Sequence, residues 1–520
     1  MSRVVLTADQ TLMSDYNRNI FLGFTACSPV LIPLWIFQSL FCPPISHKNG
    51  IALAAPYGLR KIEASLIEHG FDEDEVRVAH PAHLDKVVDK DTRVIGISTN
   101  DPLGLGPAST TFSDLVGRET YSSVSFIRLL KDPEIRKYDP KIIVGGPGAW
   151  QLDDARIMAK LGIDSILIGE GELRAPEIFE RAVRGEEIPS VVEGGPAPVD
   201  KIPTIRAPSL NGLVEIARGC GRGCRFCNPT MRQFRSVPIE QILREVRVNI
   251  EGGYGVLLHA EDVLRYGAKG PIPDERKVTT LFKEVARYTL RVGISHFALS
   301  SVLSRPELIG EISEVLEVGK GGRIWLSGQT GIETGSTRLI ERHLRGKVKP
   351  FGPDEWREVV VEAFGLLQDN RWVPCATLIM GMPGEEREDV LITLELIEEL
   401  KTFKSLIVPL FFVPVGRLER ERFFRRKDML PEHWMLLSAC IRHDLGWVRE
   451  LAAEHLEMTG IRGVKRWAID RIIAYAARKL GPYLELMDEG IPPYRDPDHT
   501  SGFNRRVYRM ITHTIHGLYQ

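Results

Sequence analysis

Short apolar runs alternate with longer amphipathic stretches over residues 1 to about 200. Runs of four to six residues rich in Val and Ile are typical of buried strands, and the stretches between them carry apolar residues at helical spacing, as at Leu59, Ile62 and Leu66. This alternation predicts an α/β fold with a doubly wound parallel sheet. The expected strands are Val4–Thr7, Val76–Ala79, Val94–Thr99, Lys141–Val144 and Ser165–Ile168.

The pattern of a strand followed by a helix repeats six times between residue 201 and about residue 415. Such repetition predicts the parallel strands of a barrel, or of part of one, and in parallel barrels the chemistry lies at the C-terminal ends of the strands. The expected strands are Leu213–Ala217, Gly255–His259, His296–Ser300, Arg323–Ser327, Pro374–Met380 and Leu406–Phe412.

Beyond about residue 415 the pattern is helical. Apolar residues at helical spacing predict a helix with one face in a core. These residues are Val464, Trp467, Ile472, Ala476 and Leu480. We therefore expect three domains, formed by residues 1–200, 201–415 and 416–520.

One segment near the start of the chain is unusually apolar, since no Asp, Glu, Lys or Arg lies between Asn19 and His47. A stretch of this length can reach across a bilayer, but prolines interrupt it and no net basic run precedes it as in a signal peptide. We expect the part from Ile20 to Cys42 to be buried or to cover a cofactor. Contact with a membrane or a lipid is the alternative.

Composition limits the classes of function. A chain of 520 residues with 43% hydrophobic and 26% charged residues is ordinary for a globular protein with well-buried cores. Lys and Arg number 67 against 69 Asp and Glu, so there is no basic excess that would favour nucleic acid as a partner. The low number of cysteines, 7, fits a reducing cytoplasm.

Three of these cysteines, Cys220, Cys224 and Cys227, stand at CxxxCxxC spacing just after the first expected barrel strand. Three thiolates on one short loop favour an iron-sulfur cluster, in which they ligate three irons and leave the fourth open to a substrate. Glycines at positions 219, 221 and 223 let the backbone fold around such a cluster.

Other readings of the three cysteines are weaker. Buried thiols would need an apolar setting, but Arg218, Arg222 and Arg225 lie among them. A zinc site would need a fourth Cys or His at finger or ribbon spacing, and none follows. Disulfides are disfavoured by the odd count and by the lack of a secretory signal pattern.

The motif, with Phe226 before the last cysteine, resembles the signature of radical S-adenosylmethionine (radical SAM) enzymes. The resemblance implies a 4Fe-4S cluster whose open iron chelates SAM, and a partial barrel of six strand-helix units. It also implies SAM contacts at the strand ends, with Glu261 and Asp262 for the ammonium and Gln329 and Glu333 near the ribose and carboxylate. Capping of nearby turns and helices is the alternative role of these segments.

The N-terminal sheet ends its strands in small and polar residues, which is similar to the Rossmann-like cobalamin-binding domain found ahead of many radical SAM cores. The Asp-x-His-x-x-Gly motif, which supplies a lower cobalt ligand in other corrinoid proteins, is absent, and neither His69 nor His80 fits its spacing. The lower ligand is therefore unidentified. The cofactor contacts implied by the resemblance are Ser98, Asn100, Asp101, Pro102, Leu103, Gly145, Gly146, Pro147, Gly169, Glu170, Gly171 and Glu172.

Together the two resemblances imply a cobalamin-dependent radical SAM C-methyltransferase. In such enzymes a 5'-deoxyadenosyl radical abstracts hydrogen from carbon, methylcobalamin gives its methyl group, and a second SAM restores it. A one-electron reductant such as ferredoxin or flavodoxin is implied as a partner. No residue of this chain is singled out as catalytic.

The substrate expectation rests on three segments. Thr7–Gln10, Asp101–Pro107 and Gln329–Glu333 resemble a set associated with methanogenic archaea, in which similar proteins C-methylate a glutamine of methyl-coenzyme M reductase. This implies a peptide or protein substrate. Two other functions stay open: coupling or cyclising lipid chains, with residues 20–42 as a lipid channel, and a non-enzymatic corrinoid carrier, which would leave the CxxxCxxC loop without a purpose.

Overall fold

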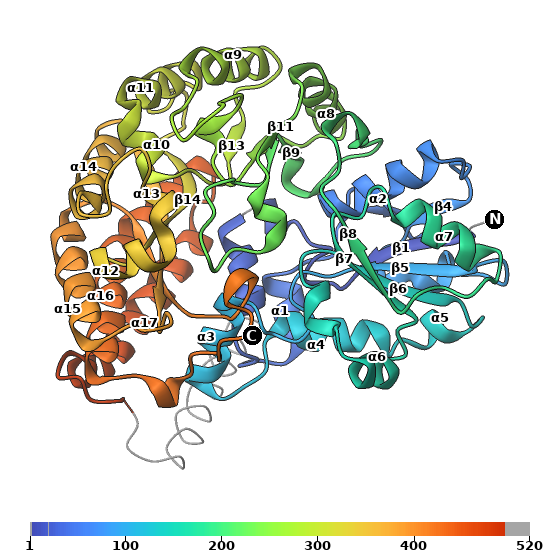
Figure 1. Cartoon of the computed structure of the whole chain (residues 1–520), viewed down its shortest axis with the longest axis horizontal. Helices are drawn as coiled ribbons and strands as arrows, with labels where there is room; N and C mark the ends of the chain where they lie inside the picture. Colours follow the sequence, from blue (N-terminus) through green and yellow to red (C-terminus); the bar gives the residue numbers. More distant parts are fainter. Residues whose placement is uncertain (1–2, 19, 494–520) are drawn as a thin grey trace. The chain divides into compact units, whose positions relative to one another are not determined.

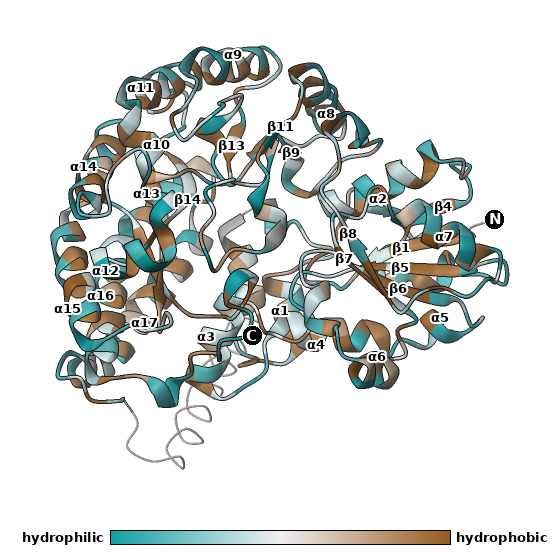
Figure 2. Ribbon diagram, viewed as in Figure 1, coloured by the Kyte–Doolittle hydropathy of each residue, from teal (hydrophilic) through white to brown (hydrophobic). Residues whose placement is uncertain are grey.

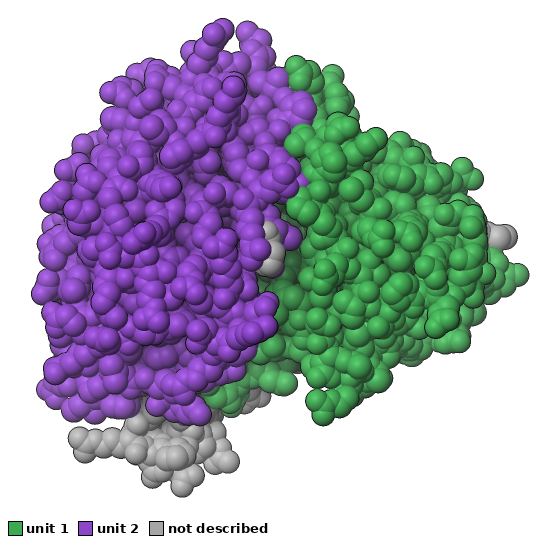
Figure 3. Space-filling view, in the orientation of Figure 1, with its two compact units in different colours: residues 1–214, 240–256, 498–520 green, residues 215–239, 257–497 purple. Residues whose placement is uncertain are grey.

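The computed structural model describes residues 3–18 and 20–493, and this part of the chain forms two compact units (Figure 3). Unit 1 holds residues 3–18, 20–214 and 240–256, and unit 2 holds residues 215–239 and 257–493. The three-domain division stays a prediction.

The sheet of unit 1 has six parallel strands in the order β4-β1-β5-β6-β7-β8 (Figure 1). All five expected strands are confirmed. The sequence missed β8, in which only one of four residues is buried. The strands are β1 (Val4–Ala8), β4 (Val76–Val78), β5 (Val94–Ser98), β6 (Lys141–Gly145), β7 (Ser165–Gly169) and β8 (Val191–Gly194), beside a small hairpin of β2 (His47–Lys48) and β3 (Ile51–Ala52).

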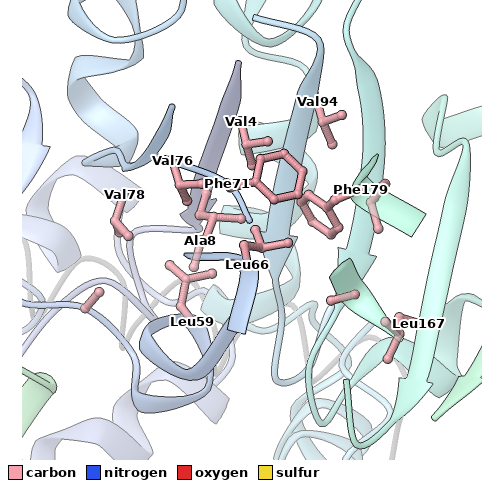
Figure 4. Close-up of a cluster of buried hydrophobic side chains, with 14 of the residues drawn as sticks. Val4, Ala8, Leu59, Leu66, Phe71, Val76, Val78, Val94, Leu167 and Phe179 are labelled. Carbon is pink, nitrogen blue, oxygen red and sulfur yellow. The ribbon is translucent and has the colours of Figure 1, made fainter. Parts of the chain in front are cut away.

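Helices pack on both faces of this sheet, which confirms the doubly wound arrangement. On one face Leu59 and Leu66 of α2 join Phe179 of α7 in a cluster with the strands (Figure 4). On the other face Phe126 of α4 and Met158 of α6 pack on alternate strand residues. Figure 2 shows β5 between these layers as mostly hydrophobic. The helices are α1 (Leu34–Leu40), α2 (Tyr57–Glu68), α3 (Pro107–Val116), α4 (Tyr121–Leu130), α5 (Pro133–Arg136), α6 (Ala155–Leu161), α7 (Ala175–Val183) and α8 (Ile239–Glu251).

Unit 1 also contains a buried ion pair. Lys61 of α2 lies 2.5 Å from Glu245 of α8, and the two side chains are 3% and 2% exposed. Lys61 also donates to the carbonyl of Pro203. Because the helix pattern put polar residues on the outside of α2, this pair was not expected; it ties residues 203–209 and α8 to the sheet domain.

The uncharged segment packs on its own unit. Phe37 of α1 stacks on Tyr121 with ring centroids 3.7 Å apart, and the Tyr121 hydroxyl bonds the backbone of Ile32 at 2.9 Å. The expected burial is confirmed for Ile32, Phe37 and Cys42, while Trp35 is 67% exposed. In the described part of the chain no helix is long and apolar enough to cross a membrane.

The strands that follow form two three-stranded sheets, β13-β12-β9 and the parallel β14-β15-β16. A bridge between His296 and Gln329 joins them, so six strands make the expected partial barrel. The strands are β9 (Leu213–Glu215), β12 (Val256–His259), β13 (Val292–Ile294), β14 (Leu326–Glu333), β15 (Trp372–Met380) and β16 (Leu406–Phe411), with β10 (Ala217–Arg218) and β11 (Arg235–Ser236) as a separate pair.

Two of the expected barrel strands were misplaced. The strand expected at His296–Ser300 is β13, four residues earlier, because Leu299 and Val302 belong to the next helix. The strand expected at Arg323–Ser327 is β14, which continues to Glu333 since its polar and glycine residues pair in register with β15. Gln329 therefore lies within a strand rather than after one.

Helices follow the barrel strands, and two long ones end the described chain. They are α9 (Glu275–Ala286), α10 (Leu299–Ser304), α11 (Pro306–Val315), α12 (Thr337–Leu339), α13 (Arg345–Val348), α14 (Trp356–Asp369), α15 (Arg387–Glu399), α16 (Pro431–Met458) and α17 (Val464–Asp488).

The expected helix at Val464 is confirmed as α17, but its apolar stripe is not a core face. Trp467 is 59% and Ile472 is 52% exposed, and Ala476 is exposed as well. The buried residues lie further on, at Leu484 and Met487, where the helix packs on α16. The spacing predicts the helix correctly, but it does not show which turns of the helix pack against another element.

Candidate functional site

The three cysteines lie on a loop between β10 and β11, directly after the first barrel strand. β10 and β11 pair antiparallel, and the amide groups of Cys220 and Gly221 both donate to the carbonyl of Met231, at 2.9 and 2.8 Å. Gly219, Gly221 and Gly223 have φ angles of 72°, 70° and 74°, which L side chains rarely adopt. The expected glycine-dependent loop at a strand's C-terminal end is thus confirmed.

Arg222 anchors the loop. Its guanidinium lies 3.0 Å from the carboxylate of Asp262, donates to Ser301 Oγ at 2.9 Å and reaches the carbonyls of Lys347 and Lys349, each at 3.0 Å. The side chains of Arg222 and Asp262 are 5% and 2% exposed. A buried pair with this many hydrogen bonds holds its geometry firmly, because breaking it would leave a buried charge unpaired.

Asp262, expected at the SAM ammonium, is used for this anchor. One carboxylate oxygen accepts from Arg222 and from Ser301 at 2.6 Å, and the other accepts from the amide of Ala298 at 3.3 Å. It makes no side-chain capping bond to the following turn. Glu261 beside it is half-buried and forms no such network in the described structure, so of the two carboxylates it is the one left to meet a ligand.

The thiols are free and half-buried. Burial raises the pKa of Cys220, and a hydrogen bond from Cys227, with the nearby Lys347 ammonium, lowers the pKa of Cys224 to about 7. Phe226 is half-buried between the second and third cysteine. An all-sulfur donor set on a preformed loop suits an iron-sulfur cluster, in which each thiolate binds a different iron. In the described residues no group of three or more His, Cys, Asp or Glu side chains is placed to hold a single metal ion.

Glu333 ends β14 and forms an ion pair with Lys347. The Glu333 Oε1 to Lys347 Nζ distance is 2.8 Å, and the side chains are 9% and 16% exposed. Burial alone would lower the pKa of Lys347, but the charges of Glu333, Cys224 and Cys220 outweigh it and raise that pKa. The capping alternative for this segment is confirmed at Ser336, whose side chain accepts from the amide of Leu339.

Two neighbouring histidines were not predicted as site residues, and one of them, His296, forms a bridge with Gln329. His259 ends β12, His296 follows β13, and their ring centroids are 5.8 Å apart. Burial lowers the pKa of His259 to about 4 and also lowers that of His296, while the charge of Glu261 acts in the opposite direction on both. Both rings are therefore neutral near neutral pH. Their position at barrel strand ends was the signal that could have found them.

In unit 1 the expected cofactor residues meet at one edge of the sheet. Ser98 to Leu103 follow β5, Gly145 to Pro147 follow β6, and Gly169 to Glu172 follow β7, so the carboxyl ends of three neighbouring strands bring them together. The strand order reverses between β1 and β5, and ligands of such sheets bind at this switch point.

Several of these residues shape the loops themselves. Asp101 accepts from the amide of Gly106 at 2.9 Å and from Gln151 at 2.7 Å, and Gln151 accepts from the amide of Leu103 at 3.0 Å. Glu170 accepts from the amide of Ala197 at 2.9 Å. These contacts explain the polar residues in the pattern without a ligand.

The glycines at this edge serve loop packing. A Cβ at Gly148 would lie 2.4 Å from the carbonyl oxygen of Asn100, and one at Gly146 would lie 2.6 Å from that of Thr99. At Gly146 and Gly148 glycine is therefore required by the close approach of the loop after β5.

Two buried hydroxyls at the switch point are unsatisfied. Thr99 Oγ1 follows β5 and Thr110 Oγ1 lies in α3, and neither has a hydrogen-bond partner among the described residues. Both residues are 0% exposed. Buried hydroxyls normally find partners, so these two would favour a polar group of a ligand that reached them; among the described residues Ser109, Ser125 and Ser165 share this property.

Comparison with known proteins defines the class of the barrel. Residues 214–397 match the model of the Radical SAM superfamily, so this segment is a radical SAM domain, and the predicted 4Fe-4S cluster and SAM are its cofactors. The segment contains the three cysteines and Arg222, Glu261, Asp262, Gln329, Glu333 and Lys347.

Particular relatives are more distant. A probable threonylcarbamoyladenosine tRNA methylthiotransferase of Methanothermobacter thermautotrophicus is 26% identical over 274 residues, 51% of this chain and 59% of that protein. A tRNA-2-methylthio-N(6)-dimethylallyladenosine synthase of Thermotoga petrophila is 24% identical over 295 residues, 56% of this chain and 62% of that protein. The chain thus covers less than two thirds of the length of these relatives.

A solved structure shares the fold over more of the chain. The radical SAM methyltransferase TsrM from Kitasatospora setae, solved with cobalamin and a 4Fe-4S cluster bound, superposes with a TM-score of 0.54 at 13% identity, over 80% of this chain and 77% of its own. This likeness confirms the predicted combination of a parallel-sheet domain, a partial barrel and a helical C-terminal region.

Proposed function

We propose that this chain is a cobalamin-dependent radical SAM C-methyltransferase that methylates an unactivated sp3 carbon of a peptide or protein residue. The observation that carries the proposal is the pairing, in one chain, of an anchored three-cysteine loop with a sheet edge whose buried hydroxyls lack partners. The fold likeness to a methyltransferase solved with both cofactors supports it.

In unit 2 the residues fit a cluster and SAM. Cys220, Cys224 and Cys227 would hold the cluster, and Glu261 is the carboxylate free to accept from the SAM ammonium. Bound there, the cluster supplies one-electron reduction of SAM to a carbon-centred radical. The neutral rings of His259 and His296 at the ends of β12 and β13, with Gln329 inside β14 beside His296, offer uncharged hydrogen-bonding groups to a substrate.

In unit 1 the residues fit a large amide-rich ligand. Thr99 and Thr110 would hydrogen-bond the side-chain amides of cobalamin, which supplies a transferable methyl group. The contacts of Asp101 and Gln151 hold the loop after β5 in the shape that brings Thr99 to this edge.

For the substrate we propose a peptide segment, with the glutamine of methyl-coenzyme M reductase as the best specific choice. The balanced net charge of -2 gives no electrostatic reason to expect tRNA. A one-electron reductant of the ferredoxin or flavodoxin class is the proposed electron donor.

Anaerobic turnover tests the proposal. The full chain is reconstituted with iron, sulfide and hydroxocobalamin, and given reductant, SAM with a labelled methyl group and a peptide containing that glutamine. We expect 5'-deoxyadenosine, S-adenosylhomocysteine and a labelled peptide heavier by one methylene group. Formation of 5'-deoxyadenosine without the other two products would rule out methyl transfer while retaining the radical step.

The sequence relatives favour a second candidate, methylthiolation of tRNA. That reaction needs a sulfur source in addition to a methyl group. The remaining cysteines, Cys27, Cys42, Cys375 and Cys440, are scattered in the sequence, and burial raises the pKa of each of their thiols. In the same assay, a tRNA nucleoside that gains both sulfur and the labelled methyl group would favour this candidate.

A lipid-coupling enzyme or a corrinoid carrier fits the structure less well. Residues 20–42 would have to form the lipid channel, but Phe37 is buried against Tyr121 in a packed cluster. A carrier has no use for the Arg222 anchor under the cysteine loop. Lipid that purifies with the chain would support the first, and a function retained after loss of all three cysteines would support the second.

A further inference from the structure

The turn at α13 is clamped onto the cysteine loop. A Cβ at Gly346 would lie 1.5 Å from the carbonyl oxygen of Arg222, so only glycine allows this approach. Next to it, the amide of Arg225 donates to the carbonyl of His343 at 3.0 Å. Residues 343 to 346 therefore lie directly against the middle of the loop.

The turn after β16 is clamped onto the end of the same loop. Gly416 has a φ angle of 65°, and a Cβ there would lie 2.0 Å from the carbonyl oxygen of Cys227. The amide of Arg417 donates to the carbonyl of Arg225 at 2.9 Å. The backbone of Arg225 is thus bonded to both turns, which holds the two turns and the loop together within unit 2.

These three segments are rich in basic residues. Between residues 216 and 239 the chain has five Arg and no Asp or Glu, and between residues 342 and 349 it has four Arg or Lys and again no acid. Some of these cations are used in ion pairs, as Arg222 is with Asp262 and Lys347 is with Glu333. The exposed ones, none of which forms an ion pair with another described residue, are Arg225, Arg342, Arg345, Lys349 and Arg417.

One partner protein can contact all five. Arg417 is bonded to the backbone of Arg225, and Arg342 and Arg345 lie within two residues of its other partner. Since successive Cα atoms are 3.8 Å apart, these positions lie within about 15 Å of Arg225. Lys349 is held near them because its carbonyl accepts from the anchoring arginine of the loop at 3.0 Å. A standard interface covers about 800 Å² on each partner, which is wide enough for this spread.

Exposed carboxylates interrupt this basic surface. Glu341, Glu419 and Glu421 lie in or beside the same turns. They would repel the regularly spaced phosphates of RNA, whereas an acidic protein can place neutral or basic groups opposite them. The surface therefore fits an acidic protein better than a nucleic acid.

We propose that the exposed basic residues around the cysteine loop form the docking surface for an acidic one-electron donor protein of the ferredoxin or flavodoxin class. One electron passes from the reduced donor, which is oxidised, to the cluster, and no bond forms or breaks. The donor has to come close to the cluster, and these residues lie on the segments clamped to the loop that would hold it. The inference rests on the cluster-binding half of the proposed function and is independent of methyl transfer.

Stopped-flow reduction of the reconstituted full chain tests this surface. The chain, without SAM, is mixed anaerobically with excess reduced acidic ferredoxin, and the second-order rate constant is taken from the loss of cluster absorbance. The variant Arg345→Glu/Lys349→Glu/Arg417→Glu reverses three charges on the two turns and leaves the cysteine loop itself unchanged. Complementary charge speeds association by about 10- to 1,000-fold, so this variant should be reduced at least about tenfold more slowly than wild type in low salt. In about 0.5 M salt the two rates should converge, because salt screens exposed charges.

Two controls separate docking from an effect on the cluster. The variant Arg276→Glu/Lys283→Glu/Lys320→Glu makes the same change in net charge on exposed residues of α9 and of the turn after α11, and it should match wild type. Reduced methyl viologen, a small cation, should reduce the variant with the reversed turns at least as fast as it reduces wild type.

Equal ferredoxin rates for wild type and the variant with the reversed turns would overturn the proposal, as would an equal slowing with viologen. Labelled tRNA that binds wild type but not this variant, with an unchanged ferredoxin rate, would assign the surface to RNA instead. If the variant holds no cluster, Arg345→Gln/Lys349→Gln/Arg417→Gln replaces it, with a slowing in the same direction expected. A wild-type chain that binds no cluster would instead overturn the proposed function, so the two failures are distinguishable.

Discussion

The two candidate sites differ in the kind of side chain that builds them. In unit 2 the cysteine loop is held by buried charges, with Arg222 on Asp262 and Lys347 on Glu333. At the sheet edge of unit 1 the carboxylates of Asp101 and Glu170 accept hydrogen bonds from neutral backbone and amide groups, and among the described residues the hydroxyls of Thr99 and Thr110 have no partner. In unit 2 charged side chains thus pair with opposite charges around the cysteine loop, whereas in unit 1 the carboxylates of the loops are bonded to neutral groups.

The largest effect should come from removing the cluster ligands. Replacing Cys220, Cys224 and Cys227 by Ala should abolish the cluster absorbance and lower 5'-deoxyadenosine formation by more than about 100-fold, since even outer contacts to a metal site cost 10–100-fold. Cobalamin binding, measured by equilibrium dialysis, should be unchanged because its proposed site lies in unit 1. Cys27→Ala is the control. Loss of cobalamin binding in the triple variant would contradict the prediction that cobalamin binds independently of the cysteine loop.

Buried ion pairs allow a matched comparison. Asp262→Ala leaves Arg222 buried without its partner, and Lys61→Ala does the same to Glu245 in unit 1. Each should lower the free energy of unfolding by about 3–5 kcal/mol, measured by urea denaturation. Only Asp262→Ala should also lower the iron content after reconstitution. Equal iron loss in both variants would show that stability, rather than the local anchor, controls cluster loading.

Acid should affect the two units alike. Burial, with the nearby rings of His83 and His47, lowers the pKa of His80 in unit 1 from 6.5 to about 4, and burial lowers that of His443 in unit 2 to about 4. Between these pH values the unfolded chain binds a proton that the folded chain does not, so stability is complete above pH 6.5 and is lost as the pH falls towards 4. The loss from His80, which is 0% exposed, is roughly 3 kcal/mol.

The measurement is urea unfolding of wild type and His80→Gln at about pH 7 and about pH 5. Gln can still accept from the amide of Ala82, as His80 Nδ1 does at 3.1 Å. The variant should lose less stability between the two pH values than wild type. An equal loss would show that His80 is not the proton-binding group.

Elements were predicted correctly where the hydrophobic pattern of the segment itself determines its structure. The strands of unit 1 were found because apolar runs such as Val94–Ser98 are buried on both faces. β14 was misplaced since Gln329 and Gly331 are poor strand formers whose pairing with β15 overrides propensity. The prediction that Trp467 and Ile472 lie in a core was wrong, because helical spacing does not show which element, if any, packs on that helix face.

In the candidate site, too, the local motif was predicted and the long-range contacts were not. The cysteines are a local motif and were found. Arg222, Lys347 and Asp262 act through contacts between residues 40 to 125 positions apart, for which one sequence has no pattern. Asp262 was noticed for its charge, but its partner Arg222 was not, and its contact with SAM stays a prediction.

The smallest effect sharpens the comparison most, because its sign is unusual. Thr99→Val removes a buried hydroxyl without a partner, so the free energy of unfolding should rise by up to about 1 kcal/mol, while Thr7→Val, which removes a bond to the carbonyl of Ala79 at 3.0 Å, should lower it by about 1 kcal/mol. If the hydroxyl of Thr99 is kept for a ligand, Thr99→Val should also weaken cobalamin binding several-fold in equilibrium dialysis, and Thr7→Val should not. Thr99→Val would then raise the free energy of unfolding and weaken cobalamin binding, whereas Asp262→Ala would lower both the free energy of unfolding and the iron content. A more stable Thr99→Val variant with unchanged cobalamin affinity would place the ligand away from the β5 end of the sheet.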